Sequence, residues 1–183
     1  MRHILFILGA FFILNQSGFG FDGHRKGFTL GLGFGYSPTT RVSLDQLDLA
    51  PADDSFVFDF SIGWAFGRDL FVYEVSIYQI PHGLESESSC CNDVGIGEAQ
   101  GRWYHYFGDE GWTFFSCVGA GRTFTSAYSN FLTGDGLGFV VGGGYEFFKQ
   151  IQVGAYYQGG YSKGNGFTYG TRSLQLVLHI TAY

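Results

Sequence analysis

Charged side chains that recur at alternate positions within apolar segments are the first candidates for chemistry in this sequence. An unpaired buried charge is costly, so wherever the fold encloses these residues we expect acids and bases to pair with one another. The candidates for interior charges are Asp59, Glu74, Glu98, Arg102, Arg122 and Glu146.

A hydrolytic site is a second option, because His82 is followed closely by Glu85, Ser86 and Ser88. A serine needs an adjacent base to act as a nucleophile. However, Ser and His are common in loops that have no catalytic role. We therefore predict no catalytic residues in this segment and interpret the chain as a non-enzyme.

The other histidines do not predict a metal site. A metal needs three or four converging ligands, and the spacing of His105 and His179 shows no such set. We interpret His105 as a residue at a membrane interface and His179 as a hydrogen-bonding residue of the interior. No metal and no other cofactor is predicted.

The sequence has three cysteines, with Cys90 adjacent to Cys91 and Cys117 further along. An exported protein meets an oxidising compartment, so Cys90 or Cys91 could form a disulfide or an intermolecular link. Because the number is odd, one thiol stays unpaired within a monomer. Incidental loop cysteines are the equal alternative.

Acidic residues cluster in two segments that we expect to be loops. Clustered oxygens can coordinate calcium, but no EF-hand-like spacing is present, so simple solvation is favoured. These acids are Asp45, Asp48, Asp53, Asp54, Glu85, Glu87 and Asp93.

Residues 1–20 have the three parts of a secretory signal peptide. Arg2 and His3 precede an apolar stretch over 4–14, and Gly18-Phe19-Gly20 closes the segment. We predict cleavage after Gly20, with Gly18 as the alternative. The mature protein is then one domain over 21–183.

The composition is unlike that of an ordinary soluble surface. Charged residues are 14%, aromatic residues are 20%, and there are 30 glycines. After the leader, every apolar run is interrupted within a few positions, which excludes helical membrane spans of about 20 apolar residues. The net charge of -6 does not suit a nucleic-acid partner, which requires a basic face.

Strict alternation of large apolar and small or polar residues predicts β-strands of about 9 to 11 residues, long enough to cross a bilayer when tilted. In the first segment Phe28, Leu30 and Leu32 alternate with Thr29 and Gly31. The facing of the fifth segment is open, because neither phase is uniformly apolar. The eight segments are 27–37, 56–66, 71–77, 94–107, 112–124, 137–147, 151–161 and 173–181.

The connections alternate in length, and this alternation predicts a barrel. Long connections are expected at 38–55, 81–93, 125–136 and 163–171, and short ones at 67–69, 108–111 and 148–150. Outer-membrane barrels have short periplasmic turns, longer extracellular loops and an even number of strands. We therefore predict an all-β, transmembrane, antiparallel up-and-down β-barrel of about eight strands.

The less apolar phase consists mainly of Gly, Ser, Thr and Ala, which suits a crowded interior. With about eight strands the interior is just wide enough for side chains to fill it, which predicts a polar plug rather than an open channel. The alternative is a soluble sandwich or a lipocalin-like barrel, with the apolar phase inside. That alternative must explain many glycines on a wet face, where they weaken strands.

The leader, the first strand, the connections and the final segment 174–183 resemble the small eight-stranded outer-membrane barrels of the OmpA and OmpX type, over the whole mature chain. The resemblance is one of pattern, without a diagnostic motif. It implies the bacterial outer membrane with periplasmic termini, a bilayer containing lipopolysaccharide, and the barrel-insertion machinery as a partner. Tyr183 supplies the terminal aromatic residue of that group, but on the opposite phase from Leu178 and Ile180.

Some barrels of this size are lipid A deacylases with a Ser, a nearby His and an acid. Where the resemblance would place their His-x-Ser-Asn element, residues 154–159 contain neither His nor Ser. We therefore expect a non-enzymatic surface barrel whose long loops mediate adhesion, envelope integrity or contact with an extracellular ligand. A narrow pore or conduit for small hydrophobic molecules and a lipid A-modifying enzyme are the alternatives.

Overall fold

The computed structural model describes residues 25–44, 47–48, 55–81, 93–109, 111–127, 134–164 and 167–183. The predicted signal peptide over 1–20, His82 with its neighbouring serines, and the Cys90–Cys91 pair all lie outside these residues. No helix in the described part is long and apolar enough to span a membrane.

The described residues form nine strands in a single sheet. The strands are β1 (Lys26–Leu44), β2 (Leu47–Asp48), β3 (Ser55–Phe66), β4 (Asp69–Pro81), β5 (Asp93–Tyr106), β6 (Thr113–Ala127), β7 (Gly134–Phe147), β8 (Ile151–Gly164) and β9 (Phe167–Ala182).

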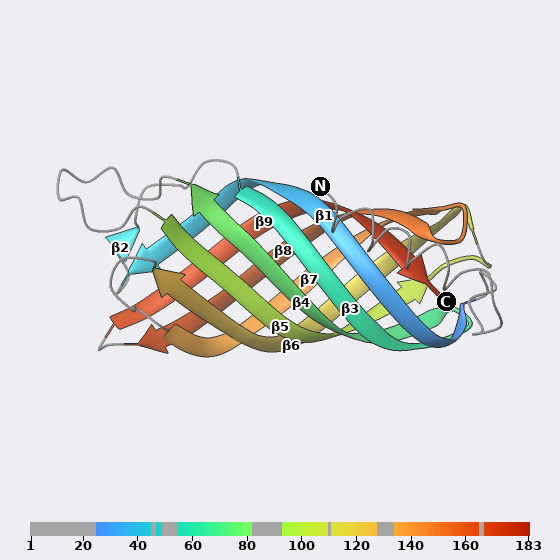
Figure 1. Cartoon of the computed structure of the whole chain (residues 1–183), viewed down its shortest axis with the longest axis horizontal. Helices are drawn as coiled ribbons and strands as arrows, with labels where there is room; N and C mark the ends of the chain where they lie inside the picture. The colour runs from blue at the N-terminus through green and yellow to red at the C-terminus, as the bar shows by residue number, and fades with distance from the viewer. Residues whose placement is uncertain are drawn as a thin grey trace, which may run out of the picture.

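The sheet closes on itself as an antiparallel barrel. Each strand from β3 to β8 pairs with the next, β1 pairs with β3, and β1 also pairs with β9, so these eight described strands form a closed wall (Figure 1). β2 is a two-residue extension paired with the end of β1, so eight of the nine described strands make the wall. The predicted up-and-down barrel is confirmed.

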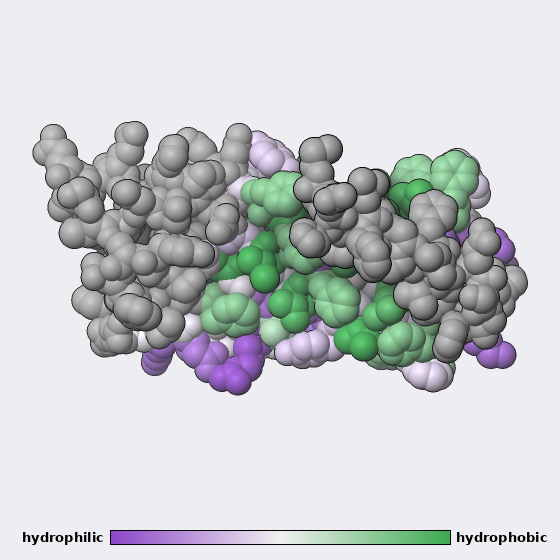
Figure 2. Space-filling view, viewed as in Figure 1, coloured by the Kyte–Doolittle hydropathy of each residue, from purple (hydrophilic) through white to green (hydrophobic). Residues whose placement is uncertain are grey.

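The alternation seen in the sequence becomes two faces of this wall. Along β3, Val57, Asp59 and Ser61 are buried, whereas Phe58 and Phe60 are exposed. Large apolar side chains cover the middle of the visible described surface (Figure 2). The buried face is largely polar, which is the arrangement expected when the medium around the barrel is apolar.

Burial of alternate side chains also shows which residues of β6 point outwards. Phe114, Val118 and Phe124 are exposed on the outer wall, and Phe115 and Cys117 are buried. Both phases of this strand carry aromatic residues, because part of the interior is itself aromatic. The hydropathy pattern of the segment was therefore ambiguous.

The strands extend further than predicted at the end opposite the short turns. β8 runs to Gly164 and β9 begins at Phe167, so the expected long loop over 163–171 is wrong and most of it is a paired hairpin. The alternation of hydropathy stops before the pairing does, because the outward residues there are Lys163 and Arg172 instead of apolar ones.

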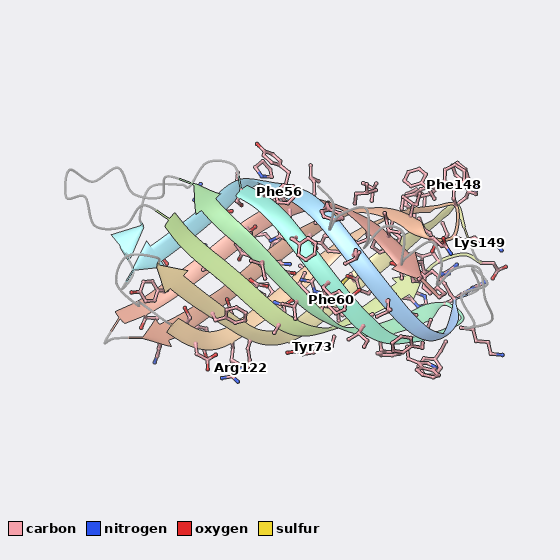
Figure 3. The ribbon with its side chains drawn as sticks, in the orientation of Figure 1. Phe56, Phe60, Tyr73, Arg122, Phe148 and Lys149 are labelled. Atoms are coloured by element: carbon pink, nitrogen blue, oxygen red, sulfur yellow. The ribbon has the colours of Figure 1, made fainter. Side chains whose placement is uncertain are left out.

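The start of β1, the end of β9 and the short turns lie together at one end of the barrel, on the right in Figure 1. The Arg25 carbonyl accepts a hydrogen bond from Gly67 N at 2.8 Å, and Thr181 N donates to Gln150 O at 2.8 Å. Phe148 has a positive φ of 53°, a left-handed conformation typical of a tight turn. Its side chain stands out from the wall in Figure 3.

Candidate functional site: the barrel interior and its outer rim

The interior of the barrel is organised around Arg102, whose guanidinium is buried midway along β5. It donates to Glu74 Oε1 as an ion pair, to Ser76 Oγ at 3.0 Å and, through Nε, to Gln100 Oε1 at 3.3 Å. The second oxygen of Glu74 accepts from the Tyr104 hydroxyl at 2.9 Å. These residues are neighbours because inward-facing positions of β4 and β5 alternate in register.

A second carboxylate, Glu98, extends this arrangement across the barrel. It accepts from the Tyr78 hydroxyl at 3.2 Å and from Gln100 Nε2 at 2.5 Å. From β8, the Gln158 amide is oriented to donate to Glu98 at 2.8 Å and to accept from Arg102 at 2.6 Å. We define the central network as the residues joined by these bonds, namely Glu74, Ser76, Tyr78, Glu98, Gln100, Arg102, Tyr104 and Gln158. It joins opposite walls, so the barrel is filled at this level.

Asp59 and His179 form a third buried group beside the central network. His179 Nε2 lies 3.4 Å from Asp59 Oδ2, and both side chains are almost fully buried. Gly33 lies between them on β1, and a Cβ there would come within 2.9 Å of Asp59 Cβ and 3.1 Å of His179 Cε1. The missing side chain at Gly33 is therefore what makes room for the pair.

Asp59, Glu74 and His179 bring three potential metal ligands within 4.8 Å of one another. Sequence spacing did not predict this convergence, since the three residues are far apart along the chain. Both oxygens of Glu74 already accept hydrogen bonds, from Arg102 and Tyr104. The Arg102 charge also repels a cation, so the group fits an ion-pair network better than a metal site.

A second cluster, the terminal plug, fills the barrel at the short-turn end. The Tyr183 hydroxyl lies 3.1 Å from the Tyr106 hydroxyl, and Gln152 Nε2 donates to both at 2.7 and 2.8 Å. Tyr183 also donates to Glu146 at 3.3 Å. Arg25 lies 3.6 Å from Glu146 and stacks over the Tyr106 ring at 4.0 Å. The C-terminal aromatic ring is thus inside the barrel, not on its outer face.

Five of the six charges that were expected in the interior are buried there, namely Asp59, Glu74, Glu98, Arg102 and Glu146. The expectation for Arg122 is corrected. Its side chain is 69% exposed on the outer wall, where it pairs with Asp135 (Figure 3). Arg122 shares its phase with the outward Phe114 and Val118, and it lies near the strand end, where water can solvate it.

Cys117 is buried in the wall of the interior and forms no disulfide. Burial makes a thiol inert, because the reactive thiolate is disfavoured in apolar surroundings. His179 is an interior residue, as the sequence suggested.

A polar group interrupts the outer apolar face next to the short turns. Asp69 Oδ1 accepts from Trp103 Nε1 at 2.8 Å and from His105 Nδ1 at 2.9 Å. Ser116 is the register partner of His105. Among the described residues no hydrogen bond joins these two side chains, so the link between base and nucleophile that a catalytic serine needs is not formed.

A closed antiparallel barrel with apolar side chains outside and a filled polar interior defines the class of small outer-membrane β-barrels. Solved structures of this class are similar to the chain. They include Neisserial surface protein A (TM-score 0.58, 16% identity, covering 84% of this chain and 96% of that one).

Ail, the attachment invasion locus protein of Yersinia pestis, solved with the heparin analogue sucrose octasulfate, gives a TM-score of 0.52 at 16% identity, over 84% of this chain and 99% of Ail. The outer membrane protein OprG of Pseudomonas aeruginosa gives 0.50 at 12% identity, over 88% and 98%. The sequence matches no protein-family model and no curated protein. At sequence identities of 12% to 16%, the similarity to these structures establishes the fold alone.

Proposed function

We propose that the chain is an outer-membrane protein whose eight-stranded barrel spans the bilayer, with both termini in the periplasm. The exposed rings of Phe56, Phe60 and Tyr73 support this, since they would face acyl chains instead of water. A bilayer core offers no partner to backbone amides, and a closed barrel satisfies all of them internally. In this orientation the ends of the strands opposite the short turns face the outside of the cell, next to lipopolysaccharide.

Its function is non-enzymatic and resides in the segments that connect the strands at that outer end, which mediate adhesion, envelope integrity or contact with a ligand. The observation that most supports this proposal is the filled interior of the barrel. The central network and the terminal plug occupy the barrel at two levels, so transport through it has no continuous path.

The chemistry of the ligand follows from the acids in and beside the first two connections at the outer end of the barrel. Ail was solved with a sulfated glycan analogue, but here residues 38–55 and 81–93 carry seven acids, Asp45, Asp48, Asp53, Asp54, Glu85, Glu87 and Asp93. Like charges at an interface are costly. A neutral or basic surface is therefore the favoured partner, and a polyanion is not.

Cells that display the protein would test this proposal. We expect them to bind host cells or matrix, and variants with shortened 45–54 or 82–92 segments to lose this binding. Soluble heparin should not compete. Heat-modifiable gel migration of each variant serves as the control for a folded barrel. Unchanged binding and unchanged envelope integrity in folded, shortened variants would contradict the proposal.

Conductance in planar bilayers separates this function from that of a narrow pore. Both filled levels should keep the wild-type protein silent, whereas steady single-channel steps would favour the pore. For an enzyme acting on lipid A, mass spectrometry of lipid A with and without the protein should show an altered profile, and we expect no change.

A further inference from the structure

The outer wall of the barrel has a groove where one side chain is missing. Gly101 faces outward on β5, and a Cβ added there would approach only the Ala120 carbonyl, at 3.9 Å. The neighbouring Tyr73, Trp103 and Val118 have side chains that rise around this gap. The groove has a volume of about 350 Å³. Tyr73 lies on the outer edge of the barrel in Figure 3.

The groove is apolar and open. Phe71 and Trp103 form one wall, with their rings stacked at 6.4 Å and 13°. The register explains this geometry, since Tyr73 pairs with Gly101 and Trp103 pairs with both Phe71 and Val118. Because the groove lies on the face that we assign to the bilayer, the molecules that reach it are lipid acyl chains.

A polar group lies just beyond the end of the groove that faces the short turns. Asp69 lies two positions from Phe71, which is about 7 Å along a strand. Both hydrogen bonds to its carboxylate, from Trp103 and His105, converge on Oδ1. Among the described residues nothing bonds to Oδ2, although the side chain is 38% exposed. An oriented carboxylate with a free, accessible oxygen suits a cationic group that can donate hydrogen bonds.

We propose that this groove is a binding site for a phospholipid with a primary ammonium headgroup, of the phosphatidylethanolamine type. One acyl chain lies over Gly101 against Phe71 and Trp103, and the ammonium donates to Asp69 Oδ2. The aromatic side chains mark the level where headgroups begin, which places ammonium and carboxylate at the same depth. The inference rests on the proposed function, because it needs the barrel to lie in a bilayer with its short turns towards a phospholipid leaflet.

Native mass spectrometry of the full mature protein tests the site, with phosphatidylethanolamine, phosphatidylcholine and phosphatidylglycerol of identical chains as probes. The wild type should retain the ethanolamine lipid best. An exposed ion pair contributes up to about 1 kcal/mol, so the preference should reach about fivefold. Asp69→Asn keeps an oxygen for Trp103 and His105, and it should lower this preference to about one without unfolding the barrel.

Gly101→Leu fills the groove and should weaken retention of all three lipids, whereas Ala155→Leu adds nearly the same bulk to the outer face of β8 and should change nothing. Equal retention of the three lipids by the wild type, stronger retention of phosphatidylglycerol, or no effect of Gly101→Leu would overturn the site. If the protein inserts into vesicles and shows any of these results, the site alone fails. Failure to insert at all overturns the proposed function together with the site.

Discussion

Arg102→Met should be the most destabilising single change in the barrel interior. Methionine has a similar length but no charge, so the substitution leaves the Glu74 carboxylate buried without its cation. The side chains of Arg102 and Glu74 are each only 1% exposed, so water cannot take over the lost interaction. The bonds from Arg102 to Ser76 and Gln100 are lost at the same time.

The magnitude follows from the burial of the pair. Removing one partner of a buried ion pair costs about 3 to 5 kcal/mol, a change of about 10²- to 10⁴-fold in the unfolding equilibrium. With a urea slope of about 2 kcal/mol per molar, the unfolding midpoint should fall by about 1.5 to 2.5 M.

Urea titration of protein folded in lipid vesicles, followed by tryptophan fluorescence and by heat-modifiable gel migration, measures this shift. The double variant Arg102→Met with Glu74→Gln is the matched control. It removes both charges together and should recover to within about 1 kcal/mol of the wild type, because replacing a whole buried pair is often neutral. A midpoint for Arg102→Met equal to that of the wild type, or a double variant as unstable as the single one, would refute the role of the central network.

Three further changes probe other parts of the barrel. Tyr183→Phe removes a hydroxyl with three interior partners and should lower the free energy of unfolding in urea by about 1 to 2 kcal/mol. An unchanged unfolding midpoint would show that the terminal plug does not stabilise the barrel. Phe60→Arg, in the middle of β3, should lower the free energy of unfolding in vesicles by about 2 to 4 kcal/mol. Phe66→Arg, at the end of β3, should lower it by only about 0 to 1 kcal/mol, and equal losses would argue against a bilayer around the barrel. Gly144→Ala would bring a Cβ into collision with the Val153 carbonyl of β8 and should reduce the folded fraction on gels, whereas Gly101→Ala should be tolerated. The opposite order would contradict close packing of the wall at Gly144.

The barrel itself could be predicted from the sequence because its two faces meet different media. An apolar medium outside and a crowded polar interior force alternation along every spanning strand, as in Phe58, Asp59 and Phe60. Alternation of hydropathy does not predict a strand where its outer face no longer meets an apolar medium. Beyond the apolar face, Lys163 and Arg172 project into a polar environment, the alternation ends, and the continued pairing of β8 with β9 leaves no trace in hydropathy.

The position of Arg122 could not be predicted for a related reason. Charge alone does not distinguish an interior residue from one on the outer wall near a strand end, since both positions accept an arginine that has an acidic partner. The partner decides, and Asp135 comes from the neighbouring strand through a register that the sequence does not display. The same applies to Asp59 and His179, which meet only because β1 places Gly33 between them.

The seam between β1 and β9 makes the first and last strands of the described chain nearest neighbours. A chain without β9 would leave the free edge of β1 unpaired and would lack the tyrosine that fills the short-turn end of the barrel. Synthesis of β9 therefore precedes closure of the wall, and a variant that lacks β9 should yield a species that cells recognise as unfinished.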